Sequence, residues 1–416
     1  MISLVSFAVC GLTIIHASIF RRNILTPLYL YILTVSLTLG ISYLKLDKAM
    51  TDFHLLTWFV LLTAAVAFLF GTQTARLAFR LPYVTNDSTY NWTYHHLFSW
   101  LLFFTFLFCS YPVYQYSGGF PLFSSKLQSI TNGSQIDFGY RVYGYASGSL
   151  VFLMFITSSF RRACMITPIR WVSRIMAIST FSFTLLLNPT RSNLMCSAAL
   201  FVISFHYLSR RIPAWLLPLL LIASIGGFVG IGFAKSQYAE TAESLGLKKV
   251  LHLPYIYIAN NYWNLDYALN PPTDKEIHPF TWGLDGLNGI TEAIIIGPAR
   301  TNAYHWDSPF NEKASKQKGL NTTGYLWEAY KDFRALGVIG IPFFIGFFSN
   351  WMYLRIRYHF TVRLHMIYCL FLYYISMWWF VDAYKIAMNW IWIFIIIFVT
   401  AISTRYATKP TKQLVS

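Results

Sequence analysis

Long apolar runs separated by short polar joints recur along the whole chain. Each run has few or no charges and is long enough to cross a bilayer as a helix. The first run lacks the basic start and small-residue cleavage site of a signal peptide, so we predict that it is a permanent span. The pattern predicts eleven spans, at residues 2–20, 26–44, 54–72, 96–114, 145–160, 171–188, 193–208, 213–233, 335–354, 364–383 and 386–404. The expected fold class is therefore an all-α polytopic membrane protein.

The composition agrees with this class. The 416 residues are 56% hydrophobic and only 12% charged, whereas soluble domains carry about 25% charged residues. The five cysteines lie in or beside apolar runs, without metal or redox spacing. The common hydrolase, nucleotide and zinc motifs do not occur with supporting context. We therefore expect neither a metal nor a cofactor.

Basic residues mark one side of the predicted membrane topology. The predicted joints at alternate positions and the C-terminal tail hold 16 basic residues and one acid, Asp87. By the positive-inside rule this side is cytoplasmic, which places the N-terminus outside and the C-terminus inside. The net charge of +16 is then mainly an orientation signal. No single basic patch supports nucleic-acid binding.

Two predicted external segments are longer than a joint needs to be. They are residues 115–144 and 235–334, and loops of this length are usually functional or disordered. The second segment is rich in aromatic residues and balanced in charge, which favours a small folded helical cap. The chain thus divides into spans one to eight at 1–234, the large external loop at 235–334, and spans nine to eleven with the tail at 335–416.

Three arginines on the external side are candidates for binding an anion. Arg191 stands in LNPTRSNLM between two predicted spans, on the side where short joints hold few positive charges. Arg141 precedes the fifth span, and Arg300 lies in the large loop. The planar guanidinium fork suits phosphate oxygens. A simple interfacial role remains the alternative for each of them.

The other candidate residues lie in the large loop and at the start of the ninth span. His305 is a candidate base or a packing residue in an aromatic segment. Asp332 is a candidate base, a partner that orients an arginine, or a helix cap. Lys331 and Glu328 are most simply a surface helix pair.

Three segments, read in order, resemble a known family. They are TRSNLMCSAALFVISF, then LPYIYIANNYWNLDYALNPP followed by FTWGLDGLNGI, and then NTTGYLWEAYKDFRALGVIGIPFFIGFF. Together they resemble the Wzy-type O-antigen polymerases, or oligosaccharide repeat-unit polymerases, of bacterial envelopes. The resemblance covers roughly residues 185–350 by motif. It implies a GT-C-like membrane glycosyltransferase of the inner membrane, which extends surface polysaccharide from undecaprenyl-diphosphate-linked oligosaccharides.

The resemblance also implies roles for particular residues. Arg191 corresponds to the external arginine of the family, Asp332 to its acidic residue before the next span, and Asn321 to the asparagine that opens this motif. Arg334 departs from the family, which usually has glycine there, and would add an anion contact or alter the helix start. The expected partners are the lipid-linked substrates, membrane lipids, a chain-length regulator and a flippase.

The expected reaction needs neither a metal nor a covalent intermediate. An acceptor hydroxyl attacks the anomeric carbon, undecaprenyl diphosphate leaves, and Arg191 with Arg141 or Arg300 stabilises the departing charge. Asp332 or His305 would take the proton. Two alternatives remain open. One is an O-antigen ligase, whose usual histidine in this region is missing here. The other is a lipid-linked-oligosaccharide flippase, which would carry buried charges near the middle of the membrane and usually repeated halves.

Overall fold

The computed structural model describes 13 segments of the chain, and within them it is helical without strands. The described residues are 1–20, 22–46, 51–79, 90–124, 138–164, 166–187, 191–216, 247–270, 282–283, 289–290, 324–358, 360–379 and 387–405. Within these ranges, the side chains of 138–146, 191–193, 247–254, 256–257, 387 and 405 are not described.

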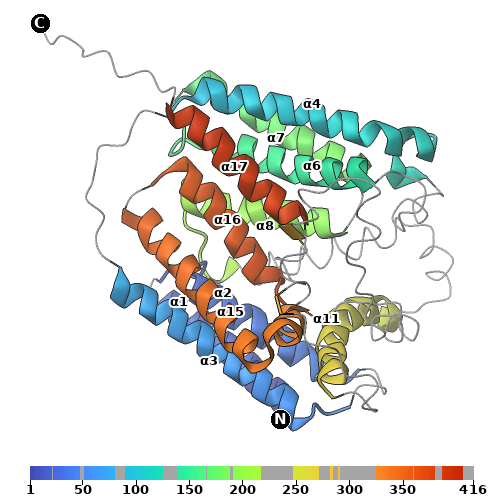
Figure 1. Ribbon diagram of the computed structural model, residues 1–416, viewed down its shortest axis with the longest axis vertical. Helices are drawn as coiled ribbons and strands as arrows, with labels where there is room; N and C mark the ends of the chain where they lie inside the picture. The colour runs from blue at the N-terminus through green and yellow to red at the C-terminus, as the bar shows by residue number, and fades with distance from the viewer. Residues whose placement is uncertain are drawn as a thin grey trace, which may run out of the picture.

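The helices form an elongated bundle (Figure 1). The first helices are α1 (Ile2–Ile19), α2 (Pro27–Ser42), α3 (Leu55–Ala78), α4 (Trp92–Ser117) and the short η1 (Pro121–Phe123). The middle of the chain forms α6 (Phe138–Ser159), α7 (Thr167–Leu187), α8 (Arg191–Leu208) and α11 (Leu247–Leu269). The last helices are α15 (Gly324–Tyr358), α16 (Val362–Met377) and α17 (Ala387–Arg405). Each predicted span except 213–233 overlaps one of these helices. Beyond residue 216, that segment lies outside the described residues.

Hydrogen bonds show which helix ends lie together at one end of the bundle. Near the end of α8, the Tyr207 hydroxyl donates to the carbonyl of Leu25, just before α2, at 2.8 Å. It also lies 3.0 Å from the hydroxyl of Tyr368 in the second turn of α16. The Arg162 guanidinium, just after α6, donates to the Tyr207 carbonyl at 2.9 Å. The starts of α2 and α16 therefore meet the ends of α6 and α8 at one end of the bundle.

The opposite end of the bundle gathers the complementary helix ends. The backbone N–H of Tyr325, at the start of α15, donates to the carbonyl of Trp378, just after α16, at 3.1 Å. Gly324 has a φ of 69°, and a Cβ there would lie 3.0 Å from the Trp379 carbonyl oxygen. Glycine is suited to this close approach and to this backbone conformation.

Apolar side chains point outward along several helices, as lipid-facing residues do. On α3 the exposed stripe is Phe59, Leu62, Val66 and Phe70. On α4 it is Leu97, Leu101, Phe104 and Phe108. Spacings of three and four residues place each stripe on one face of its helix. A soluble monomer rarely leaves such extended apolar surface in water. Within the described ranges, four helical segments are long and apolar enough to cross a membrane, namely α1, α3, α4 with η1, and α15.

Backbone contact through glycines brings α3 and α15 together. A Cβ on Gly71 would lie 2.0 Å from the carbonyl oxygen of Phe343, and one on Gly346 would lie 2.4 Å from that of Phe68. Small residues at such crossings allow two membrane helices to approach closely. Because neither Gly71 nor Gly346 has a side chain, α3 and α15 can pack with their backbones in contact.

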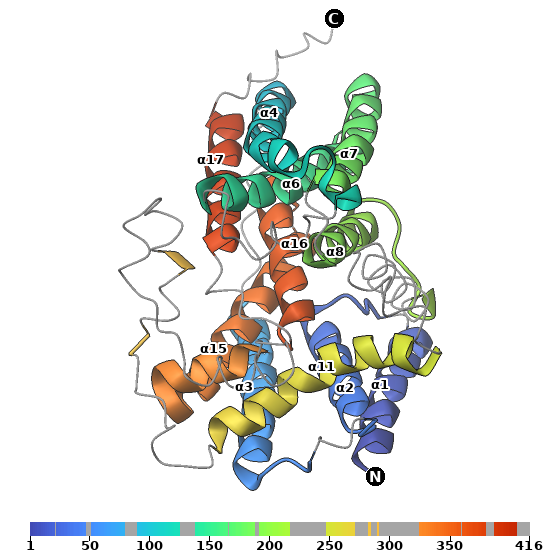
Figure 2. The ribbon, with the colours of Figure 1, turned by 90° about the vertical axis from the view of Figure 1, so that its right-hand side faces the viewer.

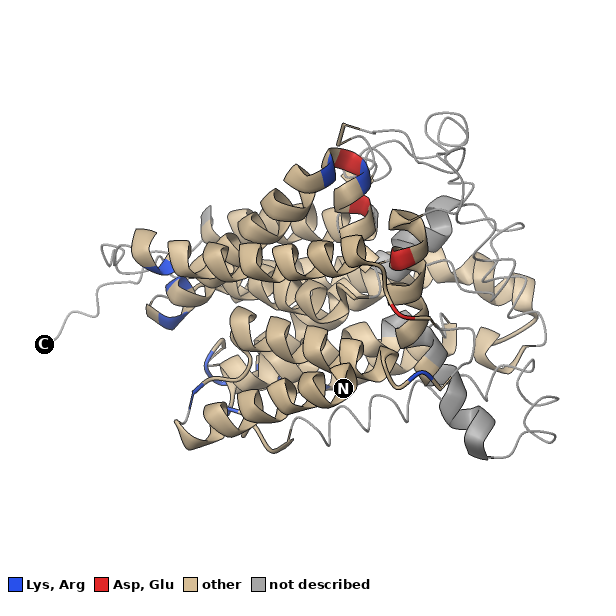
Figure 3. Ribbon diagram, turned by 90° about the horizontal axis from the view of Figure 1, so that it is seen from below, with Lys and Arg blue, Asp and Glu red and all other residues tan. Residues whose placement is uncertain are grey.

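The charged residues among those described gather at the two ends of the bundle, and one end holds basic residues alone, whereas Lys45, Lys331 and Arg334 lie with the acids at the other (Figure 3). The described arginines just after α1, α6 and α8, those in the last turns of α3 and α15, and those near the starts of α7 and α16 gather at one end. All the acidic residues within the described ranges lie toward the other end, namely Asp52, Asp266, Glu328 and Asp332. We call these the arginine end and the acidic end.

Candidate functional site

Helix α11 lies across the acidic end of the bundle. It passes over the last turns of α2 and the first turn of α3, and it lies beside α15 (Figure 2). It belongs to the segment that the sequence predicts as the large external loop. Asn260, Asn261 and Asn264 share one helix face of α11 and Asp266 lies on another, and each of the four is at most 4% exposed. Among the described residues, the Asn260 amide makes no hydrogen bond, although it is only 1% exposed. A buried amide without a partner costs about 1–3 kcal/mol, so this face is not built for stability alone.

Asp266 joins α11 to the start of α3. Its Oδ1 atom accepts a hydrogen bond from the backbone N–H of His54 at 2.8 Å and one from the Thr57 hydroxyl at 2.6 Å. Its Oδ2 atom lies 2.9 Å from Nδ1 of His54. His54 is the N-cap residue of α3, without a cap from its own side chain. The carboxylate from another helix therefore binds the N-cap residue and the Thr57 hydroxyl, and its negative charge complements the positive end of the helix dipole.

Tyrosines fasten the rest of α11 to α2 and to the loop that follows it. The Tyr262 hydroxyl lies 2.8 Å from Oγ1 of Thr38, and burial raises the pKa of Tyr262. The backbone N–H of Leu46 donates to the Tyr255 hydroxyl at 3.1 Å. That hydroxyl in turn donates to the Ser42 carbonyl at 3.4 Å. Helix α11 is thus docked at three points along its length, which makes the acidic end a defined surface.

Helix α15 is interrupted at Arg334, close to its start. Arg334 has φ 51° and ψ −134°, which divides the helix into a short first part and a long second part. Glycine adopts this conformation readily, whereas for other residues it costs of order 1–3 kcal/mol. The Arg334 guanidinium lies 5.2 Å from the centre of the Tyr330 ring. The glycine that the resembled family usually has at this position would fit the observed backbone without strain.

Buried charges lie immediately before this break. The Lys331 ammonium is 2.9 Å from Oε2 of Glu328, and the two side chains are 1% and 12% exposed. Asp332 is 2% exposed. The prediction of a surface pair is therefore wrong, because the tertiary structure encloses both side chains. Asp332 lies two residues before the break, ahead of the long second part of α15, and its role as a cap there stays a prediction.

Close contacts hold the break in place. A Cβ on Gly337 would lie 1.9 Å from the Ala329 carbonyl oxygen, so the two parts of α15 touch through their backbones. A Cβ on Gly283 would lie 2.6 Å from the Phe333 ring. Gly283 belongs to the predicted large loop. This part of the predicted loop therefore lies against the break in α15.

The structure locates some of the predicted site residues. Asp332 and Arg334 lie together at the acidic end. Arg191 is the first residue of α8 and Arg141 lies in the first turn of α6, but their side chains are not described. Both helices begin toward the acidic end, because α6 and α8 end at the arginine end. Arg300, His305 and Asn321 lie outside the described residues.

The sequence prediction did not include Asp266, His54 or Asn260. One signal for α11 was present in the chain. Asn260 and Asn264 are four residues apart, and Asn261 and Asn264 are three apart, in an otherwise aromatic and apolar helix. This spacing places amides on one helix face. The link to His54 had no local signal, because Asp266 is 212 residues away.

Comparison with known proteins adds no relative. The chain matches no protein-family model, no curated protein and no solved structure. The class to which it belongs therefore rests on its own structure. It is a helical membrane protein whose charged residues are divided between two ends, with a transverse helix over the acidic one.

Proposed function

We propose that the protein is a polysaccharide polymerase that joins undecaprenyl-diphosphate-linked oligosaccharide repeat units, with a GT-C-like fold of eleven spans. One observation carries the proposal. The three buried residues among the described Lys, Arg, Asp and Glu are Asp266, Lys331 and Asp332, and all lie at the acidic end. Buried charges are expensive and usually serve a function. Their position at one end favours chemistry at one membrane face.

The arginine end gives the proposal its orientation. Positive residues in short joints mark the cytoplasmic side, so the acidic end would face the outside of the inner membrane. The N-terminus would then be external and the C-terminus cytoplasmic. Lipid-linked repeat units that are presented on the outer leaflet would reach α11 and the α15 break directly.

The reaction follows from the groups at this end. The acceptor hydroxyl forms the new glycosidic bond at the anomeric carbon, the bond from that carbon to the diphosphate oxygen breaks, and undecaprenyl diphosphate leaves with both electrons. Arg191, with Arg141, Arg300 or Arg334, would stabilise the charge on the leaving diphosphate. The acceptor proton would pass to Asp332 or His305. Since diphosphate is a stable leaving group, the step needs no covalent enzyme intermediate.

The flippase alternative receives less support. A transport path for a charged lipid usually places ionisable side chains within the membrane interior. Among the described side chains, the buried Asp and Lys residues occur only toward one end. A ligase remains the closer alternative, because it would use the same leaving group and differ only in its acceptor.

The test is elongation by purified protein. Full-length protein in detergent or vesicles receives defined lipid-linked repeat units, and the products are separated by length. The proposal predicts a ladder of longer glycans that stay attached to lipid diphosphate. Transfer to a different acceptor would establish a ligase instead. Movement of the lipid across vesicles without any new glycosidic bond would establish a flippase.

A further inference from the structure

Helix α7 is docked on α6 through a face of small and polar residues (Figure 1). Ser173, Ala177, Thr180 and Thr184 are each at most 2% exposed. Their spacings of four, three and four residues place them on one side of the helix. The Ser158 hydroxyl of α6 donates a hydrogen bond to Oγ of Ser173 at 2.8 Å. The opposite side of α7 is therefore directed away from α6.

That opposite side is apolar and exposed, and two arginines flank it. Trp171, Ile175 and Ile178 are 59%, 61% and 67% exposed. Spacings of four and three residues align them in one stripe. Arg174 lies three residues after Trp171 and four before Ile178, and Arg170 is one helical turn before Arg174. We call these five residues the α7 surface.

Neighbours on the same helix orient both guanidinium groups. The Arg174 guanidinium lies 5.0 Å from the centre of the Trp171 ring. Nη2 of Arg170 donates a hydrogen bond to the Thr167 hydroxyl at 2.9 Å. Neither contact is to a carboxylate, so both groups keep their positive charge and most of their N–H donors. A group that is already oriented loses less entropy when it binds a ligand.

Other arginines at this end of the bundle connect helices. The Arg162 guanidinium, just after α6, donates to the Tyr207 carbonyl of α8 at 2.9 Å. Nε of Arg363, in α16, donates to the Thr400 hydroxyl of α17 at 2.9 Å. Within the described ranges, the hydrogen bonds and ring contacts of the two arginines of the α7 surface stay within α7. Their donors are therefore available to a ligand.

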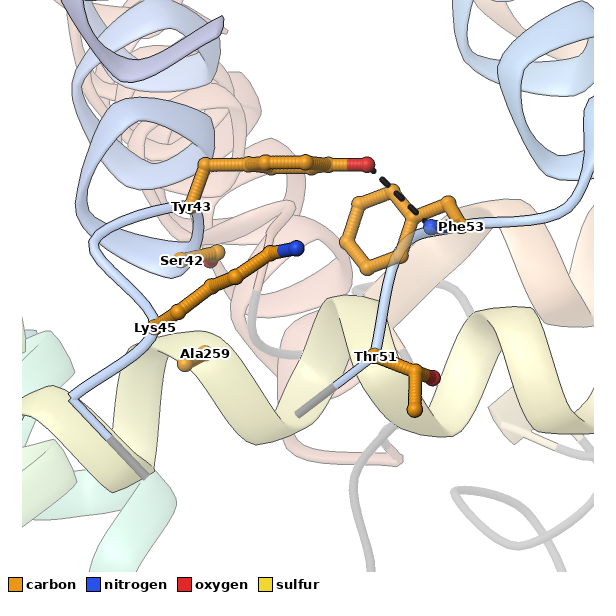
Figure 4. Close-up of a pocket in the computed structure, with 6 residues that line it drawn as sticks. All are labelled: Ser42, Tyr43, Lys45, Thr51, Phe53 and Ala259. Carbon is orange, nitrogen blue, oxygen red and sulfur yellow. Dashed lines mark hydrogen bonds between the residues drawn. The ribbon is translucent and has the colours of Figure 1, made fainter. Parts of the chain in front are cut away.

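The two lysines described at the acidic end, in contrast, have carboxylate partners. The Lys331 ammonium lies 2.9 Å from Glu328. The Lys45 ammonium, beside the small hollow that Figure 4 shows, lies 2.6 Å from Asp52.

The arginine end has no such partner among the described residues, because all four described acids lie at the other end (Figure 3). Asp87 is the single acid of the predicted cytoplasmic segments, against 16 basic residues. The chain therefore cannot neutralise this end by itself.

We propose that the α7 surface binds an anionic phospholipid, with its phosphate oxygens on Arg170 and Arg174 and an acyl chain along Trp171, Ile175 and Ile178. The guanidinium fork matches phosphate oxygens. Tryptophan suits the boundary between headgroups and hydrocarbon. One lipid molecule carries both the anion and the hydrocarbon that this surface lacks, whereas a second protein would need a matching acid beside an apolar stripe. The proposal does not depend on the reaction proposed above.

The test is native mass spectrometry of the full-length protein in detergent, titrated with phosphatidylglycerol or with phosphatidylcholine of the same acyl chains. The wild type should retain phosphatidylglycerol at lower concentration than phosphatidylcholine. The double variant Arg170→Gln with Arg174→Gln should bind the tightest phosphatidylglycerol about tenfold or more weakly, because two attractive charges are lost. Thermal unfolding of the same samples checks that the variant is folded.

A matched control removes the same charge from the same end. Arg76 and Arg357 are exposed arginines in the last turns of α3 and α15. The double variant Arg76→Gln with Arg357→Gln should retain the tightest phosphatidylglycerol as the wild type does. Equal losses in the two double variants would show attraction by net charge alone and would overturn the site on α7.

Fluorescence tests the location directly. Phosphatidylglycerol with brominated acyl chains quenches tryptophan emission at short range. The quenching that disappears in Trp171→Phe should be larger with brominated phosphatidylglycerol than with brominated phosphatidylcholine. No difference between these lipids would overturn the proposal. Displacement of the lipid by glycerol phosphate at similar concentration would also overturn it, because the surface would then be a site for soluble anions. Dimers that protect Trp171 from both lipids would assign the stripe to a second copy.

Discussion

Nδ1 of His54 and Oδ2 of Asp266 lie 2.9 Å apart, and this contact fastens α11 to the first turn of α3. The same carboxylate accepts hydrogen bonds from the His54 backbone and from Thr57. A residue of the predicted large loop thus holds the N-cap residue and the first turn of α3. The transverse helix and the bundle are therefore coupled at this point.

Loss of this carboxylate should release α11. We expect Asp266→Ala to lower the stability by about 1–3 kcal/mol, because buried donors lose their acceptor. Asp266→Asn should cost less, since it retains one acceptor oxygen. Thermal unfolding in detergent measures the effect, and hydrogen exchange should rise in α11 and at the start of α3. Asp52→Asn is the control on the exposed side. Equal melting temperatures for Asp266→Ala and the wild type would contradict the coupling.

Replacement of Arg334 by glycine separates backbone strain from side-chain function. The positive φ costs about 1–3 kcal/mol, and the contact with Tyr330 is worth about 0.5–1 kcal/mol. We therefore expect Arg334→Gly to gain about 1 kcal/mol in thermal stability. Arg334→Ala should show no such gain, because alanine retains the strain. If the guanidinium contacts diphosphate, both variants should lose elongation activity to the same degree. A destabilised Arg334→Gly would show that the residue is held by contacts stronger than its strain.

Two glycines on the same helix form a matched pair. Gly337→Ala places a methyl group 1.9 Å from the Ala329 carbonyl oxygen, whereas a Cβ on Gly340 meets nothing within 4 Å. We expect Gly337→Ala to destabilise the protein by at least about 1–3 kcal/mol, as overpacking does. Gly340→Ala should be neutral or stabilise the helix by about 0.5–1 kcal/mol. Melting temperatures of the two variants in one detergent decide the matter. A similar response in both would mean that the break does not bring these backbones together.

The ion pair of Lys331 and Glu328 should behave as a buried one. Lys331→Ala leaves a carboxylate that is 12% exposed without its cation, and such a loss typically costs about 3–5 kcal/mol. The double variant Lys331→Met with Glu328→Gln should recover most of that loss. Lys45→Asn breaks an exposed pair and should cost less than about 1 kcal/mol. A double-mutant cycle measured by thermal unfolding gives the coupling. Coupling no larger than that of the exposed pair would contradict the burial.

Arg191 is the first residue to test for activity. Removal of a single donor to the leaving group should reduce elongation by about 10²–10³-fold in Arg191→Ala. Arg191→Lys should be partly active, because lysine keeps the charge and loses the planar fork. Arg76→Ala controls for loss of an arginine at the other end. Glycan length on gels, at matched protein abundance, is the readout. Normal length in Arg191→Ala would remove Arg191 from the mechanism.

Much of the architecture follows from the local pattern of residues. Apolar runs of sufficient length form helices, because a helix satisfies its own backbone hydrogen bonds in lipid. The alternation of basic joints separates the two ends, which the structure shows as an arginine end and an acidic end. The prediction of an all-helical membrane protein is therefore confirmed at that level. The eleven spans, the GT-C-like fold and the orientation stay predictions.

The candidate site depends on contacts between distant segments, and these have no local signal. Asp266 meets His54 only because α11 folds back across the bundle. Lys331 and Glu328 form a pair at helical spacing, so the sequence alone could not distinguish a surface pair from an enclosed one. Packing of α3, α11 and α16 around the start of α15 decides that they are buried.

The sequence by itself determined the helices, their membrane character and the separation of charge, because each depends on a run of neighbouring residues. Only the tertiary structure decided that Asp266 of α11 binds the start of α3, that α15 breaks at Arg334, and that the pair of Lys331 and Glu328 is enclosed. These features depend on backbone conformation and on pairs of residues that are remote in the chain. The positive φ of Arg334 depends on the residues that surround it in the fold, and these cannot be identified from the neighbouring sequence.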